Sequence, residues 1–408
     1  MALGTSAYVP SSQAWFKIRK VDRRPLFLSS YSTSAGGAYD VKRSNRGRPF
    51  KVLFCGTDDF ALECLEKLHA NPDICDHIQV LTPADAPNRW ERSKKVVTIP
   101  PVKSFALVNG LAQHTIPEGG LDEFEIPKEF IKEAESSILL TVSFGHLIPP
   151  KMLDHFLWSR RLNVHPSLLP ALKGAAPIQW AIARGLQATG VSIQTLGTSF
   201  DSGEVLSREE VAIPPSSSYK SLREIIKPIA AERLLFTLSN LQECADTAWK
   251  NKDRPNEIEQ SHAPMIKPRM TSIRWSTWSA SKIEARHRAM GYLFSLRTEI
   301  ITQTGERAAV LLRDVDLYHH DLDSPGKPLS EQAFQLIKNA EPGELVHDKE
   351  SNRVLCRCAP EADGNEHIFL QLKSVQTAGK KEVPADQWIN GYTTTKGSIR
   401  TARFLDAN

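Results

Sequence analysis

The 408-residue sequence lacks several features that would assign a function class at once. No apolar run approaches the ~20 residues that a membrane-spanning helix requires, so we expect no membrane insertion. None of the six cysteines forms a CxxC pair, and Cys356 and Cys358 lie two apart on one face of an expected strand. We therefore expect reduced, structural thiols rather than a disulfide framework or a zinc site.

Two common catalytic signatures are also missing. The serine that follows the most informative strand, Ser167, lies in SLLP and not in the GxSxG of a nucleophile elbow. The apolar run Lys51–Gly56 leads into a helical pattern, but no GxGxxG follows it, so a dinucleotide site has weak support. These absences favour a reaction in which the substrate, and not the enzyme, supplies the nucleophile.

Acidic residues are scarce at the amino terminus. Residues 1–48 hold nine Lys and Arg but only two acids, whereas the whole chain has a net charge of +4. The rest of the chain is therefore slightly acidic, and polyanion binding there would need local basic patches. A leader that is rich in Arg and Ser and poor in acids is typical of a mitochondrial transit peptide, and an ordinary disordered tail is the alternative. We expect import into the mitochondrial matrix and cleavage before Lys51.

The most informative stretch runs from Leu162 to Leu206. A buried strand is expected to end near Val164, and residues two apart in a strand project on one side, so Asn163 and His165 should point together. A second strand is expected at Val191–Leu196, and the loop after it carries Asp201. We expect these three side chains to meet at the carboxyl ends of two strands, where open α/β sheets place their ligands.

An amide, an imidazole and a carboxylate suit attack on a carbonyl carbon. Asn163 can donate a hydrogen bond to an oxygen that gains negative charge. His165 can move a proton near neutral pH or donate to the same oxygen, and Asp201 can fix its tautomer and favour its protonated form. The alternative, for Asn-x-His taken alone, is a histidine satisfied within the core.

The whole stretch resembles the formyltransferase family that uses 10-formyltetrahydrofolate. The matching segments are NVHPSLLP, KGAAPIQWAIARG, ATGVSIQTL and DSGEVL, in the family order N-x-H-x-S-L-L-P, G-x-x-P-I and D-x-G. The resemblance implies Asn163, His165 and Asp201 as the catalytic trio, with a folate co-substrate and no metal. The sequence departs from the pattern at Pro166, where Gly is common, and at Leu196–Phe200, where the family usually has an acid and a Gly.

The same resemblance implies a folate site. An apolar strand is expected at Ile138–Phe144, and the SFGHLIP that ends it is similar to the family's A-Y-G-x-I-L-P. The residues implied as folate contacts come from this loop and from SLLP: Phe144, Gly145, Ser167, Leu168, Leu169 and Pro170.

Two basic segments resemble RNA-contacting parts of the family's tRNA-formylating branch. A solvated loop is the default interpretation of residues 83–97, but a basic loop at this place meets tRNA in that branch. SVQTAGKK is similar to the L-x-P-A-G-K-K of the branch's C-terminal domain. The residues implied are Arg89, Arg92, Lys94, Lys95, Lys380 and Lys381.

The pattern of elements predicts four parts: a leader (1–48), a catalytic domain (49–248), a linker (249–268) and a C-terminal domain (269–408). Strands that alternate with helices predict a doubly wound, mostly parallel sheet in the catalytic domain. Turn-rich strand runs near 307–312, 353–358 and 368–372 predict a small β-barrel, which the resemblance makes OB-like. Pro228 should kink or restart the helix expected over 222–241. The adjacent histidines of Tyr318–Asp321 would face opposite ways in a strand, so a metal site there is disfavoured.

We expect formyl transfer to the α-amino group of initiator methionyl-tRNA by a monomer. Three alternatives stay open from the sequence. One is a relative with another acceptor, such as glycinamide ribonucleotide or a sugar nucleotide, and another is a hydrolase in which water replaces the amine. The third is a non-catalytic tRNA-binding protein on this fold, which should tolerate loss of the trio.

Overall fold

The computed structural model describes residues 49–87, 97–248, 258–302, 304–320, 327–392, 394–396 and 399–406. The predicted leader and the basic residues Arg89, Arg92, Lys94 and Lys95 lie outside these ranges. Among the described residues, no helix combines the length and the apolar character needed to cross a bilayer. All six cysteines are buried as free thiols, and burial raises the pKa of Cys75 to about 12.

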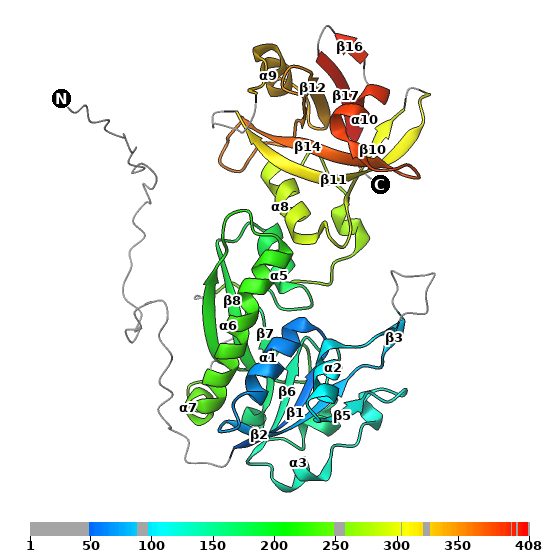
Figure 1. Cartoon of the computed structure of the whole chain (residues 1–408). Coiled ribbons are helices and arrows are strands. Elements are labelled where there is room, and N and C mark those ends of the chain that lie inside the picture. The colour runs from blue at the N-terminus through cyan, green and yellow to red at the C-terminus, as the bar shows by residue number, and fades with distance from the viewer. Residues whose placement is uncertain are drawn as a thin grey trace, which may run out of the picture. The chain divides into compact units, whose positions relative to one another are not determined.

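The amino-terminal part is built on a seven-stranded sheet with the order β5-β2-β1-β6-β7-β8-β9 among the described residues (Figure 1). Its strands are β1 (Phe50–Gly56), β2 (Cys75–Thr82), β5 (Ala112–Thr115), β6 (Ser137–Val142), β7 (Arg161–His165), β8 (Ala188–Thr195) and β9 (Val205–Ala212). The first five are mutually parallel, and β8 and β9 continue the sheet antiparallel. The predicted mostly parallel, doubly wound sheet is confirmed.

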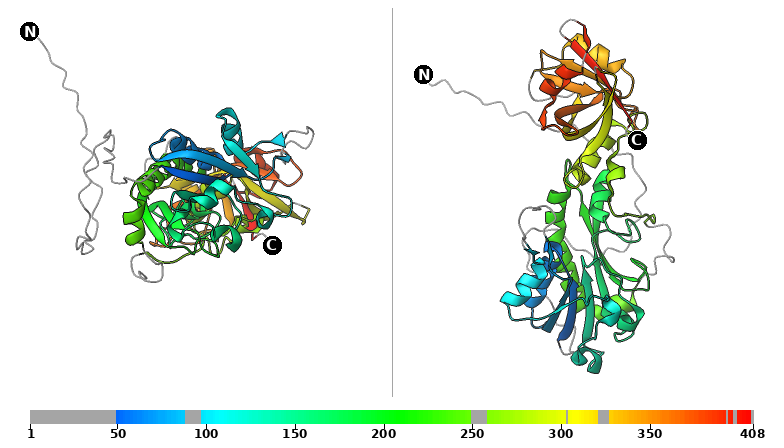
Figure 2. Two further views of the ribbon diagram at one scale, coloured as in Figure 1. Left: turned by 90° about the horizontal axis from the view of Figure 1, so that it is seen from below. Right: turned by 90° about the vertical axis from the view of Figure 1, so that its right-hand side faces the viewer.

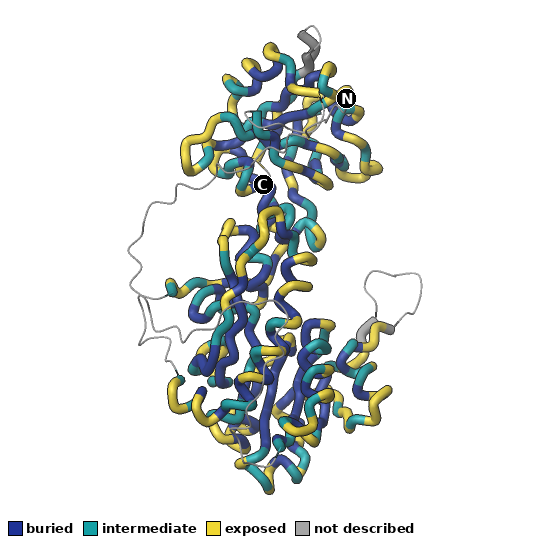
Figure 3. The backbone as a smooth tube through the Cα atoms, turned by 60° about the vertical axis from the view of Figure 1, so that its left-hand side comes forward, coloured by how far each residue is buried: buried dark blue, intermediate teal, exposed yellow. Residues whose placement is uncertain are grey.

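Helices cover both faces of this sheet because strand residues alternate between two cores. One core contains Val52 and Phe54, and the other contains Leu53 and Cys55. The first face is covered by α1 (Asp59–His69), α2 (Pro101–Val108), α5 (Pro177–Ala183), α6 (Tyr219–Ser239) and α7 (Leu241–Asp246). The second is covered by α3 (Lys128–Lys132), α4 (Pro150–Leu153) and the 3₁₀ turn at Leu121–Glu123. Figure 3 shows the strands as largely buried between these layers.

A proline affects the course of two helices in this part. Helix α5 starts at Pro177 and not earlier in the KGAAPIQWAIARG segment, because Gly174 has φ +120° and proline fits the first helical turn. Of the two effects expected at Pro228, a kink or a restart, the restart does not occur, because α6 is continuous from Tyr219 to Ser239. Burial of one side of α6, from Leu222 to Leu238, against the sheet outweighs the one backbone hydrogen bond that proline cannot make.

The prediction that the trio meets at the carboxyl ends of two strands was also wrong for the second strand. β8 is antiparallel to β7, and Thr195 at its end pairs with Leu162 near the start of β7. After β8, the Leu196 N–H donates a hydrogen bond to the carbonyl of Arg161 at the start of β7. The chain then continues to Asp201. Asp201 is therefore supplied by a loop that returns toward the sheet and not by a neighbouring strand end.

The C-terminal part contains a closed antiparallel barrel. Pairing of β10 with β17 closes a ring whose order is β10-β11-β14-β13-β12-β17, which is the predicted barrel architecture. Its strands are β10 (Leu296–Ile301), β11 (Arg307–His319), β12 (Glu344–Asp348), β13 (Arg353–Cys356), β14 (Ile368–Thr377) and β17 (Ile399–Leu405). Trp275, Trp388 and Phe404 pack together in its core. Figure 2 gives two further views of both sheets.

Shorter elements complete the described structure. The strands are β3 (Ala86–Pro87), β4 (Val97–Thr98), β15 (Val383–Pro384) and β16 (Thr394–Lys396). The α-helices are α8 (Ala280–Met290), α9 (Glu331–Lys338) and α10 (Ala385–Trp388). Further 3₁₀ turns lie at Trp158–Arg160, Pro268–Thr271 and Ile389–Gly391.

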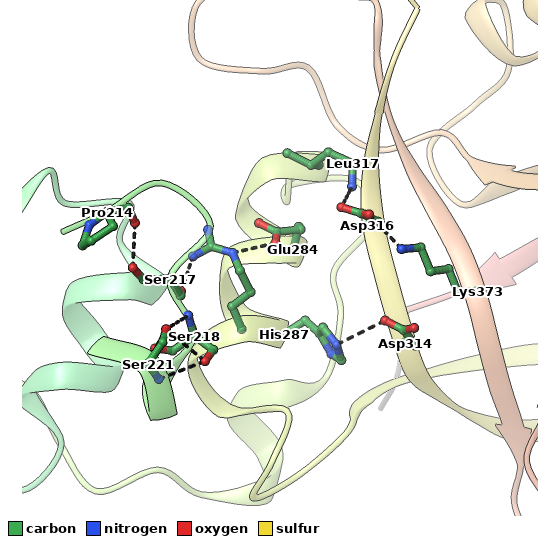
Figure 4. Close-up of polar contacts among 11 residues, drawn as sticks. Pro214, Ser217, Ser218, Ser221, Glu284, His287, Asp314, Asp316, Leu317 and Lys373 are labelled. Atoms are coloured by element: carbon green, nitrogen blue, oxygen red, sulfur yellow. Dashed lines mark hydrogen bonds and ion pairs between the residues drawn. The ribbon is translucent and has the colours of Figure 1, made fainter. Parts of the chain in front are cut away.

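Helix α8 contacts both the catalytic part and the barrel (Figure 4). Arg288 donates a hydrogen bond of 2.5 Å to the carbonyl of Ser217, which precedes α6. On the barrel side, His287 Nε2 lies 4.0 Å from a carboxylate oxygen of Asp314. Burial lowers the pKa of His287, and the Asp314 carboxylate opposes that shift. Polar side chains of α8 thus contact Ser217, which precedes the region predicted as a linker in sequence, and Asp314 of β11, which follows it.

Candidate active site

Three polar side chains form a row across neighbouring strands. Thr141 on β6 is paired in register with Asn163 on β7, and Asn163 is paired with Gln194 on β8. The Thr141 hydroxyl donates to Asn163 Oδ1 at 2.8 Å. This contact occupies the oxygen of the half-buried Asn163 amide and leaves its two N–H groups as the donors available to a ligand.

His165 ends β7 on the same face of the strand as Asn163 and is 5% exposed. Its Nε2 donates to the carbonyl of Leu172 at 3.0 Å. Its Nδ1 lies 3.4 Å from Asp201 Oδ1. Both ring nitrogens therefore face oxygen atoms that can accept a hydrogen bond.

Asp201 is held by donors other than the histidine. Gln194 Nε2 donates to its Oδ1 at 2.8 Å, and the backbone N–H of Gly174 donates to its Oδ2 at 2.7 Å. Each carboxylate oxygen therefore accepts a hydrogen bond from a group other than the imidazole, which fixes the position of Asp201 beside His165. The structure thus brings His165 and Asp201 into direct contact and places Asn163 two residues away on the same strand face.

Backbone strain is concentrated at this site. Ser143, Leu172 and Asp201 all have positive φ, at 46°, 57° and 52°. Such values cost a residue with a Cβ on the order of 1–3 kcal/mol and persist where the surroundings enforce them. The three residues lie in the loops after β6, β7 and β8, so each loop that borders the trio contains one strained residue.

The SLLP loop is held by its own serine and by β8. The Ser167 hydroxyl donates to the Ala171 carbonyl at 2.7 Å, so it is engaged within the loop and is not placed as a nucleophile. The hydroxyl of Ser192, which pairs with His165 in register, donates to Ser167 O and accepts from Leu169 N–H. The Leu169–Pro170 peptide is cis.

The residues predicted to contact folate fall into two groups. Phe144, Ser167, Leu169 and Pro170 are buried, and Phe144 packs in the core beneath α3 and α4. Gly145 is exposed with φ +74°, and Leu168 is half-buried. The two loops that carry these residues follow the adjacent parallel strands β6 and β7. Among the described residues, no group of three or more His, Cys, Asp or Glu could hold a metal ion.

The described part of the predicted tRNA set is on the barrel. Lys380 and Lys381 are exposed in the turn between β14 and β15. No contact of Lys380 or Lys381 with the trio is described. The four basic residues of loop 83–97 are outside the described ranges.

A second cationic feature was not predicted. Arg184 and Arg286 each lie 5.4 Å from the Trp180 ring, and Arg286 and Lys282 lie 4.3 and 5.6 Å from the Trp278 ring. We call these five residues the Arg/Trp ladder. Burial lowers the pKa of Arg286, and the charge of Arg184 adds to that effect. The ladder combines aromatic faces with cations, the chemistry that RNA-binding surfaces use.

Sequence reasoning also missed two polar residues that hold the trio, Thr141 and Gln194. Gln194 is buried, and its Oε1 has no hydrogen-bond partner among the described residues. Thr141 interrupts the apolar run of β6, and that interruption was the available signal, whereas Gln194 is one of several polar residues of β8. Their partners could be identified only once the strand register was known.

We expect Thr141→Val to lower kcat by about tenfold, because the Asn163 amide loses the hydrogen bond that orients it. Thr141→Ser should retain near-normal kcat. Steady-state kinetics of both variants provide the measurement. Thr189→Val is the matched control, since Thr189 is buried on β8 and its hydroxyl has no partner among the described residues. Equal losses in the two valine variants would contradict an orienting role for Thr141.

Comparison with known proteins gives matches in both parts of the chain. Residues 50–236 match the family model described as formyl transferase, and residues 265–393 match formyl transferase, C-terminal domain. The mitochondrial methionyl-tRNA formyltransferase of Rattus norvegicus is 29% identical over 91% of this chain and 86% of its own length. The methionyl-tRNA formyltransferase of Bacillus licheniformis is 30% identical over 84% and 95%. The mitochondrial protein of Homo sapiens is 30% identical over 84% and 78%.

Proposed function

Because the chain belongs to the methionyl-tRNA formyltransferase family, we propose that it transfers the formyl group of 10-formyltetrahydrofolate to the α-amino group of initiator methionyl-tRNA. The observation that supports this most directly is the contact of His165 with Asp201 beside Asn163. These groups suit a tetrahedral oxyanion, and the engaged hydroxyl of Ser167 supports a substrate amine as the nucleophile.

In the proposed reaction, the amine nitrogen attacks the formyl carbon and the carbonyl oxygen gains negative charge. The N–H groups of Asn163 donate to that oxygen. His165, whose ring nitrogens face the Leu172 carbonyl and the Asp201 carboxylate, lies beside it as the side chain able to carry a proton. Asp201 orients the imidazole through the Nδ1 contact. The intermediate collapses as the bond from carbon to N10 of the folate breaks. The amine loses one proton, and N10 gains one.

The decisive experiment follows labelled formyl groups. The purified protein is mixed with 10-formyltetrahydrofolate that carries a labelled formyl carbon and with methionyl-tRNA. Label on the methionyl amine supports the proposal, and label released as formate would establish the hydrolytic alternative. Parallel reactions with glycinamide ribonucleotide and with an amino-sugar nucleotide test the other acceptors. Label retained on the folate in every reaction would contradict the enzymatic proposal.

We propose that the folate lies against the loops after β6 and β7, with contacts from Phe144, Gly145 and the SLLP residues 167–170. For the acceptor RNA, we propose contacts at Lys380 and Lys381, at the basic residues of loop 83–97 and at the Arg/Trp ladder. Phosphates would pair with the cations of these segments, and unpaired bases could stack on the ladder's two tryptophan rings.

Lys380 and Lys381 give a measurable prediction. Replacing both with alanine should flatten the log–log dependence of methionyl-tRNA affinity on salt by a slope of up to about 2, if each lysine meets one phosphate. Folate affinity should not change, because the barrel carries no trio residue. Binding titrations at several salt concentrations provide the measurement, with Lys338 and Lys349, also on the barrel side of the chain, as the control pair.

The Arg/Trp ladder is the second described candidate for the phosphate contacts. An unchanged slope in the Lys380/Lys381 variant would remove that turn from the RNA contacts. The same titration with Arg184→Gln and Lys282→Gln, the exposed cations of the ladder, would then show whether the phosphate contacts lie there instead.

We further propose that the protein acts in the mitochondrial matrix. Its relatives from three mammals besides rat, those of Mus musculus, Homo sapiens and Bos taurus, are described as mitochondrial. The excess of basic over acidic residues before position 49 supports the same compartment.

A further inference from the structure

Residues 261–264 lie along the loop that borders the trio. We call them segment 261–264, and we call residues 170–176 the inner loop. The two backbones make four hydrogen bonds: Ser261 N–H to Pro170 O, Lys173 N–H to Ser261 O, Ala263 N–H to Lys173 O, and Ala176 N–H to Ala263 O. Lys173 and His262 pair as in a parallel strand. Part of the region predicted as a linker is therefore bonded to the catalytic domain.

The inner loop touches two members of the trio through its backbone. The Leu172 carbonyl accepts from His165 Nε2 at 3.0 Å, and the Gly174 N–H donates to Asp201 Oδ2 at 2.7 Å. The direction of these two backbone groups therefore helps to set the position of both side chains. A small rotation of the inner loop would move the imidazole and the carboxylate together.

Segment 261–264 contacts both of the residues that carry those backbone groups. The N–H of Leu172, a residue with φ +57°, donates to Ser261 Oγ at 3.0 Å. Gly174 has φ +120°, and a Cβ added to it would lie 2.7 Å from the Ala263 carbonyl oxygen. Ala263 has no exposed surface and packs with Leu172. The segment thus supports the strained residue and leaves no room for a side chain at position 174.

Side chains of α5 and of Arg184, the residue that caps its C-terminus, fix the segment from its other side. Trp180 Nε1 donates to the Pro264 carbonyl at 2.8 Å, and Arg184 donates to the His262 carbonyl at 2.5 Å. Carbonyl groups of the segment therefore accept from the inner loop and from the helix that follows that loop. These contacts hold it in one place between two elements of the catalytic domain.

We propose that segment 261–264 is a positioning element of the active site, which holds His165 and Asp201 in their reactive arrangement through the inner loop. The inference rests on the proposed formyl transfer at this site. Ser261 is the positioning residue with the clearest individual role, because its hydroxyl accepts the N–H of the residue whose carbonyl binds the histidine.

The test compares Ser261→Ala with Ser261→Thr in the full-length protein. Loss of one hydrogen bond to a strained loop should lower kcat by about tenfold, while KM for both substrates changes less than about twofold. Thr retains the hydroxyl and should restore most of kcat. Ser276→Ala, at an exposed serine further along the chain, is the matched control and should behave as wild type.

The pH profile of kcat separates positioning from general destabilisation. Ser261→Ala should displace the profile relative to wild type, because the environment of the His165 ring changes, whereas a merely less stable enzyme would keep the wild-type profile. If Ser261→Ala fails to fold, Ala263→Gly is the second variant, since it keeps every backbone bond but loosens the segment. It should also lower kcat severalfold.

The outcomes for the inference and for the proposed function are distinguishable. Wild-type protein that transfers no label would refute the proposed function before any variant is made. If wild type is active, unchanged kcat in Ser261→Ala would overturn the inference alone. A raised KM with unchanged kcat, or a threonine variant as impaired as the alanine variant, would overturn it as well.

Discussion

Replacing His165 with alanine should lower kcat by about 10²–10⁴-fold, the largest effect that we expect together with that of Asn163→Asp. The change removes a group able to carry a proton and the polar ring that borders the site of the developing oxyanion, which are separate contributions to the rate. It also leaves the Leu172 carbonyl and the Asp201 carboxylate without the ring between them. Folate and methionyl-tRNA affinities should stay within severalfold, because these contacts strengthen mainly in the transition state.

Single-turnover transfer of labelled formyl groups provides the measurement for His165→Ala. The control is His155→Ala, since His155 is an exposed histidine of the same catalytic domain. Thermal unfolding should show that the variant is folded. A folded variant with near-normal kcat would remove His165 from the mechanism. If the trio acts as one unit, combining His165→Ala with Asp201→Asn should be little worse than the more damaging single change.

Asn163→Asp should be at least as damaging as His165→Ala. The substitution keeps the shape of the side chain but replaces an amide donor with a carboxylate. A negative charge would then lie where negative charge develops on the substrate oxygen, in a site with low exposure to water. The Thr141 hydroxyl would still donate to one oxygen and would hold the new charge in place.

Asn163→Ala separates the two effects, because it removes the donor without adding a charge. We expect a loss on the order of 10² in kcat for alanine and a larger loss for aspartate, measured under the same single-turnover conditions. Equal losses of kcat in the two variants would show that the added charge does not raise the free energy of the transition state. Retention of near-normal kcat by both folded variants would exclude Asn163 from the oxyanion site.

Local patterns were sufficient to predict the parts of the site that lie close together in sequence. The two-residue spacing of Asn163 and His165 fixes their common side of β7, as expected from strand geometry. The alternation of strands and helices predicted the parallel part of the sheet, which the structure confirms. Three barrel strands were predicted in the correct places. β11 and β14 were predicted too short, since they continue to His319 and Thr377, and β13 was predicted too long, since it ends at Cys356.

Features that depend on distant partners could not be predicted in the same way. The antiparallel direction of β8 follows from how the chain returns after α5, and no residue within β8 encodes it. The bond between Leu172 and Ser261 joins positions 89 residues apart. The prolines that favoured a linker over residues 249–268 do not prevent segment 261–264 from bonding to the catalytic part. Pro264 contributes a carbonyl, which accepts from Trp180 of α5, and needs no N–H.

The bonding of segment 261–264 to the inner loop also determines where this chain could be joined to a relative in a chimeric protein. The two family models end at residue 236 and begin at residue 265, so the segment belongs to neither of them. A chimera that takes everything after residue 236 from a relative would place a foreign segment over Gly174. A crossover after Pro264 would exchange the barrel and α8 while retaining the native backbone pairing. The smallest portion that could be exchanged as an intact catalytic unit therefore extends to Pro264, well beyond β9, the last strand of its sheet.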